Sequence, residues 1–239
     1  MFLKIINQRL GFSCAALASA MAAGQVQAQS VTYDNSAYNA GYLFSACGTI
    51  ASGGSPTFGE SFLAPNLSSV SLDSFTFYLQ EWNGSDDTVS FQADIYSWNG
   101  TAATGSPLFS KSLVVTDNGA VQPVTVNTGG IALTPGADYI ALFTTLDPAS
   151  VTANGNSRAG FYWEIGDGGE STDHGGTSAW LNANDYSALN DSGSSWGSGT
   201  PFIWQATFNT PVATPEPSTI ALAGLGITAL LLRRNKSKK

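Results

Sequence analysis

Basic residues are nearly missing from the central part of this 239-residue chain. Seven of its nine lysines and arginines lie near the two ends. Between the ends, only Lys111 and Arg158 stand against sixteen carboxylates, so this body has a net charge of −14. A surface with that charge repels phosphate backbones, and nucleic-acid binding is therefore excluded as a function.

Cysteine and histidine are also scarce. Cys14 lies in an N-terminal segment that we expect to be removed, which leaves Cys47 as the one thiol of the body and allows no intramolecular disulfide there. We interpret Cys47 as a small buried side chain, with a reactive or intermolecularly linked thiol as the alternative. The one histidine, His174, lies in a glycine-rich loop with no nucleophile elbow. Neither a zinc site nor a catalytic triad is predicted.

No apolar run of the chain reaches the roughly 20 residues that a durable membrane-spanning helix needs. The N-terminal run follows Lys4 and Arg9 and ends before small residues at Val26 and Ala28, which is the arrangement of a secretory signal peptide. Residues 1–28 are therefore predicted to be a signal peptide that is cleaved after Ala28. Acylation of Cys14, as in a lipoprotein, is a weaker alternative because the apolar run continues past it.

A second run, Ile220–Leu232, has thirteen apolar or small residues. As a helix it would span about 20 Å, against about 30 Å for the hydrocarbon core of a bilayer. The positive-inside rule keeps Arg233 and Arg234 cytoplasmic, where they would stop transfer. We predict a short transmembrane helix over residues 218–232 with a basic cytoplasmic end. A GPI signal fits less well, because the tail ends in charged residues. The last helix of a globular domain also fits less well, because the run is apolar on all sides.

Between these ends, residues 29–210 predict an all-β domain. Alternation of apolar and polar residues indicates half-buried strands at Val89–Ile95 and Phe202–Phe208. In Val70–Leu79 the alternation slips by one residue at Asp73-Ser74, which predicts a β-bulge. Further strands are predicted at Thr57–Leu63, Leu108–Val115, Val121–Val126, Ala137–Thr145 and Ala159–Ile165.

Turn signals separate these strands, among them Asn99-Gly100, Thr128-Gly129-Gly130 and Thr134-Pro135-Gly136. No segment of the body shows a capped helical pattern. About ten short strands with frequent turns predict an antiparallel β-sandwich of jelly-roll type. Residues 167–200, rich in glycine, serine, asparagine and aspartate, are predicted to be a long, partly structured loop region.

The six tryptophans of the chain all lie in this body. Trp163 and Trp204 fall in strand patterns and are predicted to be core residues. The other four lie near turns, where an indole could either stack on the apolar face of a sugar ring or close an end of the sandwich. These candidate sugar-stacking residues are Trp82, Trp98, Trp180 and Trp196.

Carboxylates are numerous enough to raise two further possibilities. Oxygen ligands of the kind that calcium prefers occur at Asp86-Asp87, at Asp167, Glu170 and Asp173, and at Asn184-Asp185 and Asn190-Asp191. None has EF-hand spacing, and solvated turns explain them equally well. A glycosidase would need two carboxylates across a cleft, for which Glu60, Glu81, Glu164 and Glu170 are candidates. We expect no catalytic residue, no metal site and no cofactor, with calcium as the one alternative.

The C-terminal segment resembles a known family. Pro215-Glu216-Pro217-Ser218-Thr219, an apolar helix containing Gly224 and Gly226, and Arg233-Arg234 are similar to the PEP-CTERM sorting tail, which here occupies residues 211–239. The resemblance implies a Gram-negative type of bacterium that makes exopolysaccharide. It also implies an exosortase that recognises the sorting motif and removes the helix. The motif residues are Pro215, Glu216, Pro217 and Ser218.

The body is similar to the β-rich ectodomains that such tails carry, through stretches such as Ser61–Pro65 and Tyr96–Thr101, and this similarity implies no activity. We therefore expect an exported, non-enzymatic structural or adhesive protein associated with exopolysaccharide. Its tail would insert transiently into the inner membrane before the protein reaches the cell surface or extracellular matrix. The alternatives are a carbohydrate-binding module, with or without calcium, and a secreted glycoside hydrolase.

Overall fold

The computed structural model describes residues 29–35, 39–44, 55–81, 88–116, 120–154, 161–166, 176–183, 185–191, 194–199, 201–210 and 226. The chain divides into two compact units, one formed by Gln29–Pro211 and the other by the two terminal segments. All the strands below belong to the first unit. In the described part of the chain, no helix combines the length and the apolar character needed to cross a membrane. Apart from Gly226, the predicted membrane helix lies outside the described residues.

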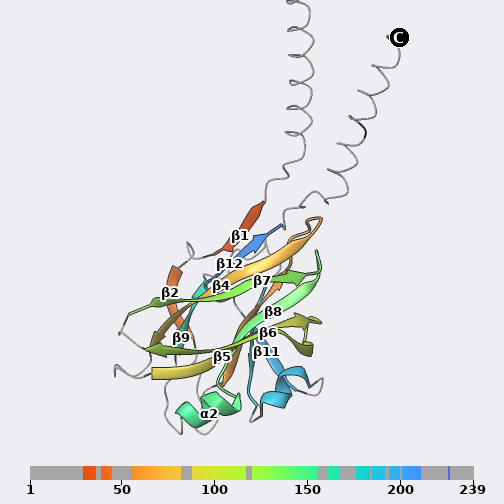
Figure 1. Ribbon diagram of the computed structural model, residues 1–239. Helices are drawn as coiled ribbons and strands as arrows, with labels where there is room; N and C mark the ends of the chain where they lie inside the picture. The colour runs from red at the N-terminus through yellow and green to blue at the C-terminus, as the bar shows by residue number, and fades with distance from the viewer. Residues whose placement is uncertain are drawn as a thin grey trace, which may run out of the picture. The chain divides into compact units, whose positions relative to one another are not determined.

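The described strands form two antiparallel sheets (Figure 1). The first sheet has the order β1-β12-β4-β9-β2. β7 lies outside this order and pairs with the edge of β4 opposite β12. Its strands are β1 (Ser30–Asp34), β2 (Asn39–Phe44), β4 (Val70–Glu81), β7 (Gln122–Leu133), β9 (Phe161–Gly166) and β12 (Trp204–Asn209).

The second sheet has the order β11-β10-β3-β8-β5-β6. Its strands are β3 (Thr57–Leu63), β5 (Thr88–Trp98), β6 (Ala103–Thr116), β8 (Asp138–Thr144), β10 (Ser178–Leu181) and β11 (Trp196–Gly199). A short α-helix, α2 (Pro148–Asn154), follows β8, and a 3₁₀ helix, η4 (Tyr186–Asn190), lies between β10 and β11.

The all-β class and the antiparallel pairing are confirmed, while the jelly-roll order stays a prediction. β3 has the predicted bounds. The β-bulge is confirmed as well, because the pairing of β4 with β7 shifts register between Leu72 and Ser74. Gly100 and Gly136 have φ of +91° and +69°, as the turns at these positions require.

The structure differs from the sequence prediction at several places: no strand is predicted at β1 or β2, and β6 and β7 are longer than predicted. Gly129 and Gly130 have positive φ but lie inside β7, so they do not end a strand. Residues 167–200 are more ordered than predicted, because they include β10, η4 and β11. The helix α2 was not predicted; its cap is Asp147, whose Oδ1 accepts hydrogen bonds from the backbone N–H of Ala149 and Ser150.

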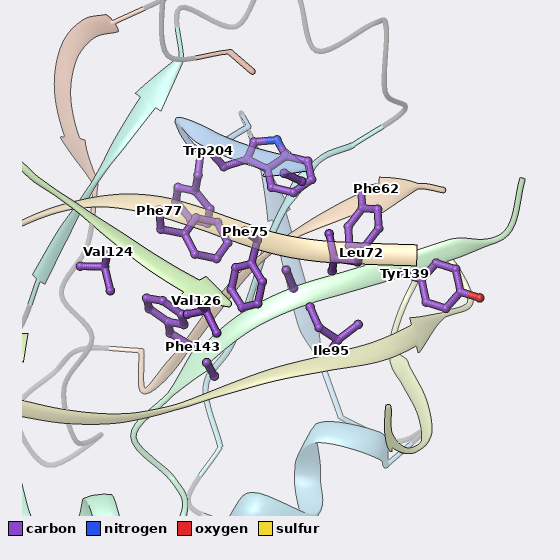
Figure 2. Packing of buried hydrophobic residues seen from close by; sticks show 14 of the residues in the cluster. Phe62, Leu72, Phe75, Phe77, Ile95, Val124, Val126, Tyr139, Phe143 and Trp204 are labelled. Carbon is purple, nitrogen blue, oxygen red and sulfur yellow. The ribbon is translucent and has the colours of Figure 1, made fainter. Parts of the chain in front are cut away.

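The main core lies between the two sheets and is dominated by aromatic rings (Figure 2). Phe75 and Phe77 share one face of β4, and their ring centroids lie 6.0 and 5.2 Å from that of Phe143 on β8. Trp204 is 1% exposed, which confirms its predicted core position. Its ring lies 5.5 Å from that of Phe62 on β3, so the same kind of contact joins β12 to the second sheet. Tilted and edge-on ring contacts of this kind add to the apolar burial that holds the sheets together.

Phe143 is the ring that most directly links the two sheets, since it contacts both Phe75 and Phe77 and is fully buried. Replacing it in Phe143→Ala removes these contacts and leaves a cavity, so we expect a loss of about 3–5 kcal/mol in the free energy of unfolding. Urea denaturation of the two proteins measures this loss. Val114→Ala is the control, because Val114 is 65% exposed and its removal should change stability by about 0.5 kcal/mol or less. Equal losses in the two variants would contradict the assignment of the core.

Candidate functional site

Several residues singled out in the sequence lie outside the described residues. These are the sorting-motif residues Pro215, Glu216, Pro217 and Ser218, the stop-transfer residues Arg233 and Arg234, and Trp82, Cys47 and His174. The other three candidate sugar-stacking residues, Trp98, Trp180 and Trp196, are described. The structure brings two of them together and separates the third.

The second sheet carries apolar side chains on both faces. Ala141 and Phe143 of β8 belong to the main core, whereas Ile140 and Leu142 alternate with them and therefore point to the outer face. Leu189 of η4 is fully buried against this face. We call these side chains the outer-face cluster: Tyr96, Ala103, Ile140, Leu142, Ala179, Leu181 and Leu189. The 3₁₀ helix thus covers apolar surface that a two-layer sandwich would otherwise expose.

Trp98 and Trp196 pack together at the border of the outer-face cluster. Trp98 ends β5 and Trp196 begins β11, and both side chains are partly exposed. Their ring centroids lie 5.3 Å apart with an angle of 82° between the planes. The buried Nε1 of Trp196 has no hydrogen-bond partner among the described residues. A perpendicular ring pair can place an N–H against the neighbouring π face, which would account for this donor.

Trp180 has a different role in packing. It lies on β10 between Ala179 and Leu181 but points to the opposite face, toward the main core. Its indole lies against Gly197 and Gly199 of β11, so closely that a Cβ atom on Gly197 would overlap the ring. Trp180 therefore closes this edge of the sandwich, the alternative to sugar stacking that its sequence position allows.

A polar network fastens η4 to β5. The carboxylate of Asp94 is fully buried and accepts hydrogen bonds from Ser110 Oγ at 2.5 Å and from the Tyr186 hydroxyl at 2.8 Å. Gln92 Nε2 donates to Asp94 Oδ1 at 3.2 Å and to the Tyr186 hydroxyl at 2.7 Å. The Tyr96 hydroxyl also reaches that of Tyr186, at 3.4 Å. Tyr186 is thus the residue through which the 3₁₀ helix joins this network.

Burial sets the protonation of this network. Burial raises the pKa of Asp94, and the hydrogen bonds from Ser110, Tyr186 and Gln92 oppose that rise. Burial also raises the pKa of Tyr186, and its hydrogen bond with Tyr96 and the nearby Asp94 carboxylate raise it further. The phenol therefore stays protonated and remains a donor to Asp94.

The acidic turns that the sequence offers as calcium ligands are engaged locally where they are described. Asp185 Oδ1 accepts from the backbone N–H of Ser187 at the start of η4, and Asn190 Nδ2 donates to the carbonyl oxygen of Gly105. Within the described residues, no three histidine, cysteine, aspartate or glutamate side chains lie together as a metal site would need. Asp185 thus forms the local turn that the sequence offers as the alternative, and calcium binding stays a prediction.

Glu60 is the one glycosidase candidate whose side chain the structure describes. It lies on β3 between Phe58 and Phe62 and is fully buried. Its Oε2 accepts from the backbone N–H of Phe202 at 3.0 Å, and its Oε1 has no hydrogen-bond partner among the described residues. Burial raises the pKa of Glu60 well above its ordinary value, although the Phe202 hydrogen bond lowers it. The side chain is therefore part of the core, and its burial favours the protonated form.

The raised pKa of Glu60 makes stability depend on pH. The ordinary value is 4.5, so above that pH the folded protein still holds a proton that the unfolded chain has released. The free energy of unfolding should therefore fall as pH rises above 4.5, until Glu60 ionises in the folded state as well. Glu60→Gln has no proton to lose and should show a smaller fall. Urea denaturation of the wild type and of Glu60→Gln at a series of pH values above 4.5 measures the two falls. Parallel pH profiles of the two proteins would contradict the raised pKa of Glu60.

The network around Tyr186 gives a second prediction. Tyr186→Phe removes one hydroxyl and leaves Asp94 Oδ2 and Gln92 Nε2 without that partner, so we expect a loss of about 1–3 kcal/mol in stability. Tyr78→Phe is the matched control, because Tyr78 is partly exposed and forms no side-chain hydrogen bond with the described residues. Chemical denaturation measures both, and a loss no larger than the control's would show that the hydroxyl does not hold η4.

Comparison with solved structures gives only distant likeness. A clostridial cysteine protease, a Cwp84 variant after propeptide cleavage, is 14% identical with a TM-score of 0.45, and the match covers 76% of this chain and 40% of that one. The cysteine protease and lectin-like domains of Cwp84, a surface layer associated protein of Clostridium difficile, match at 14% identity and a TM-score of 0.40, covering 65% and 32%. This chain thus spans less than half of either structure, and the likeness carries no argument about activity. Curated protein sequences give no match.

The C-terminal tail, in contrast, matches a defined family. The family model of the PEP-CTERM protein-sorting motif covers residues 213–235, which include the Pro-Glu-Pro triplet and both stop-transfer arginines. The match confirms the resemblance seen in the sequence, and it implies an exported protein that is sorted to the surface. The chain carries a PEP-CTERM protein-sorting motif at residues 213–235.

Proposed function

We propose that this protein is a non-enzymatic structural or adhesive component of the cell surface or extracellular matrix, associated with exopolysaccharide. The observation that carries the proposal is the sorting motif at residues 213–235. A body of about 180 residues would be exported behind its signal peptide and held at the inner membrane by its tail. An exosortase would then remove the helix and release the body.

The chemistry of the tail supports this sequence of events. The two prolines of Pro215-Glu216-Pro217 restrict the backbone to extended conformations, which suits recognition by a processing enzyme. The apolar segment after them is too short for a durable span, and Arg233 and Arg234 would stop it at the cytoplasmic face. The tail therefore acts as a temporary anchor that presents its motif outside.

The carboxylates of the body support a non-enzymatic role. Glu60 is buried in the core, Asp94 holds Tyr186, and Asp147 caps α2. Each of these acids has a packing or hydrogen-bonding role in the fold. The remaining charge would keep the body soluble in a crowded matrix, because like-charged copies repel one another.

A carbohydrate-binding module is the second candidate function. The observation that favours it is the contact between Trp98 and Trp196, two partly exposed indoles that the fold brings together from distant parts of the chain. Indoles at such positions can stack on sugar rings. A calcium-dependent form of this binding, or a hydrolase, has no comparable observation among the described residues.

Processing of both ends in the native bacterium tests the leading proposal. Wild-type protein should be recovered outside the inner membrane, beginning at Gln29 and ending near Pro217, as measured by cell fractionation and mass spectrometry of the two ends. A variant with both Pro215→Ala and Pro217→Ala should keep residues 218–232 and remain in the inner membrane. Val212→Ala, just outside the matched segment, should be processed like the wild type. Wild-type protein that keeps its tail in the inner membrane would refute the sorting proposal.

A further inference from the structure

Three partly exposed aromatic side chains lie on one border of the domain, beside the outer-face cluster. Most large aromatic residues of the described body are fully buried, including eight phenylalanines and Trp204. Trp98, Trp196 and Tyr186, in contrast, all lie at the border of the outer-face cluster and are partly exposed. Tyr186 is accounted for by its hydrogen bonds to β5, whereas the contact between two partly exposed indoles gives a border on which a sugar ring can stack.

The two indoles are held in place before any ligand arrives. Trp98 is followed by a tight turn, in which Asn99 Oδ1 accepts from the backbone N–H of Thr101 at 2.9 Å and of Ala102 at 2.8 Å. Trp196 lies in the β10–β11 pair, opposite Leu181. Perpendicular packing of the two rings then limits the rotation of each. Binding to preorganised side chains costs little conformational entropy.

Polar groups flank the aromatic side chains along the outer face of β5. Gln92 is partly exposed, and its Nε2 is used by Asp94 and Tyr186, while its Oε1 accepts no hydrogen bond from the described residues. The Tyr186 hydroxyl is fixed by three partners. From Gln92 to Trp98 the strand extends about 20 Å, enough for more than one sugar ring. Such a combination of indole faces and fixed polar groups is typical of sites that bind pyranoses.

Charge selects the class of sugar. Asp94 places a carboxyl group under the polar part of this border, and the body as a whole has a net charge of −14. Lys111, the one lysine or arginine among the described residues of the body, lies opposite Ala93, which belongs to the main core, and so on the other face of the sheet. A uronate or sulfated chain would meet repulsion and find no cation among the described residues of this border, whereas a neutral chain would meet no repulsion.

We propose that the border formed by Gln92, Trp98, Tyr186 and Trp196 binds neutral pyranose chains of an extracellular polysaccharide. Trp98 and Trp196 stack on the sugar rings, Gln92 Oε1 accepts hydrogen bonds from the ring hydroxyls, and Tyr186 holds the Gln92 side chain in place through its hydroxyl. The proposal rests on the proposed function, since it names the polysaccharide chemistry with which a surface or matrix protein of this kind would associate. η4 continues to cover the outer-face cluster, so the ligand contacts its border only.

Titration calorimetry of the protein purified from cells tests the proposal. The probes are cello-oligosaccharides and manno-oligosaccharides as neutral chains and alginate fragments as the anionic chain. We expect at least one neutral probe to bind and alginate to bind more weakly or not at all. Trp98→Ala should weaken the neutral probe at least about tenfold, as the loss of one stacking contact can. Val114→Ala, at the opposite end of the β5–β6 pair, should bind like the wild type.

A second measurement needs no variant, in case Trp98→Ala fails to fold. N-bromosuccinimide oxidises accessible indoles, and mass spectrometry of peptides locates the modified tryptophans. The neutral probe should protect Trp98 and Trp196 and leave the reactivity of Trp180 unchanged. The proposal is overturned if no neutral probe binds, if alginate binds more tightly, or if binding protects neither indole. Its failure is distinct from failure of sorting, because Trp98→Ala should still be exported and lose its tail normally.

Discussion

Aromatic packing between the two sheets is the interaction on which the rest of the structure depends. Phe143 of β8 contacts Phe75 and Phe77 of β4, and Phe62 of β3 contacts Trp204 of β12. These contacts join strands that are far apart in the chain, so they determine how the sheets lie on each other. The pairing of β12 with both β1 and β4 then brings the two ends of the body together in one sheet. The same arrangement leaves the outer face of the second sheet available for another layer.

The outer face of the second sheet carries the features that distinguish this body from a plain two-layer sandwich. η4 covers it with Leu189 and is attached through Tyr186 to a carboxylate that the sheet keeps buried. At Asp94 three donors oppose the rise in pKa that burial causes, whereas Glu60 in the main core has one donor among the described residues and its pKa is raised well above the ordinary value. The two acids show that the number of hydrogen bonds a buried carboxyl accepts affects how far burial raises its pKa.

Much of the fold follows from the sequence pattern. The bulge near Asp73 is read from alternation, because apolar and polar side chains alternate along β4. The bounds of β3 are predicted as well, although this strand is buried on both faces. Gly129 and Gly130 look like a turn in sequence, but pairing with β4 keeps them inside β7. The site is harder to predict: four tryptophans look alike near turns, and only the pairing of β10 with β11 places Trp180 against glycines and Trp196 near Trp98. Asp94 and Tyr186 have no sequence signal, since these partners lie 92 residues apart.

The sequence by itself determined that this protein carries a sorting motif. A sorting motif is a linear segment, so its residues and their order suffice to recognise it, and the family match covers that segment alone. The sequence also determined the β class of the body, because alternation is a local property. Only the tertiary structure decided which of the described tryptophans are partly exposed at the outer-face border and which carboxylates are buried. Burial and contact depend on residues brought together from distant strands, and no local pattern records them.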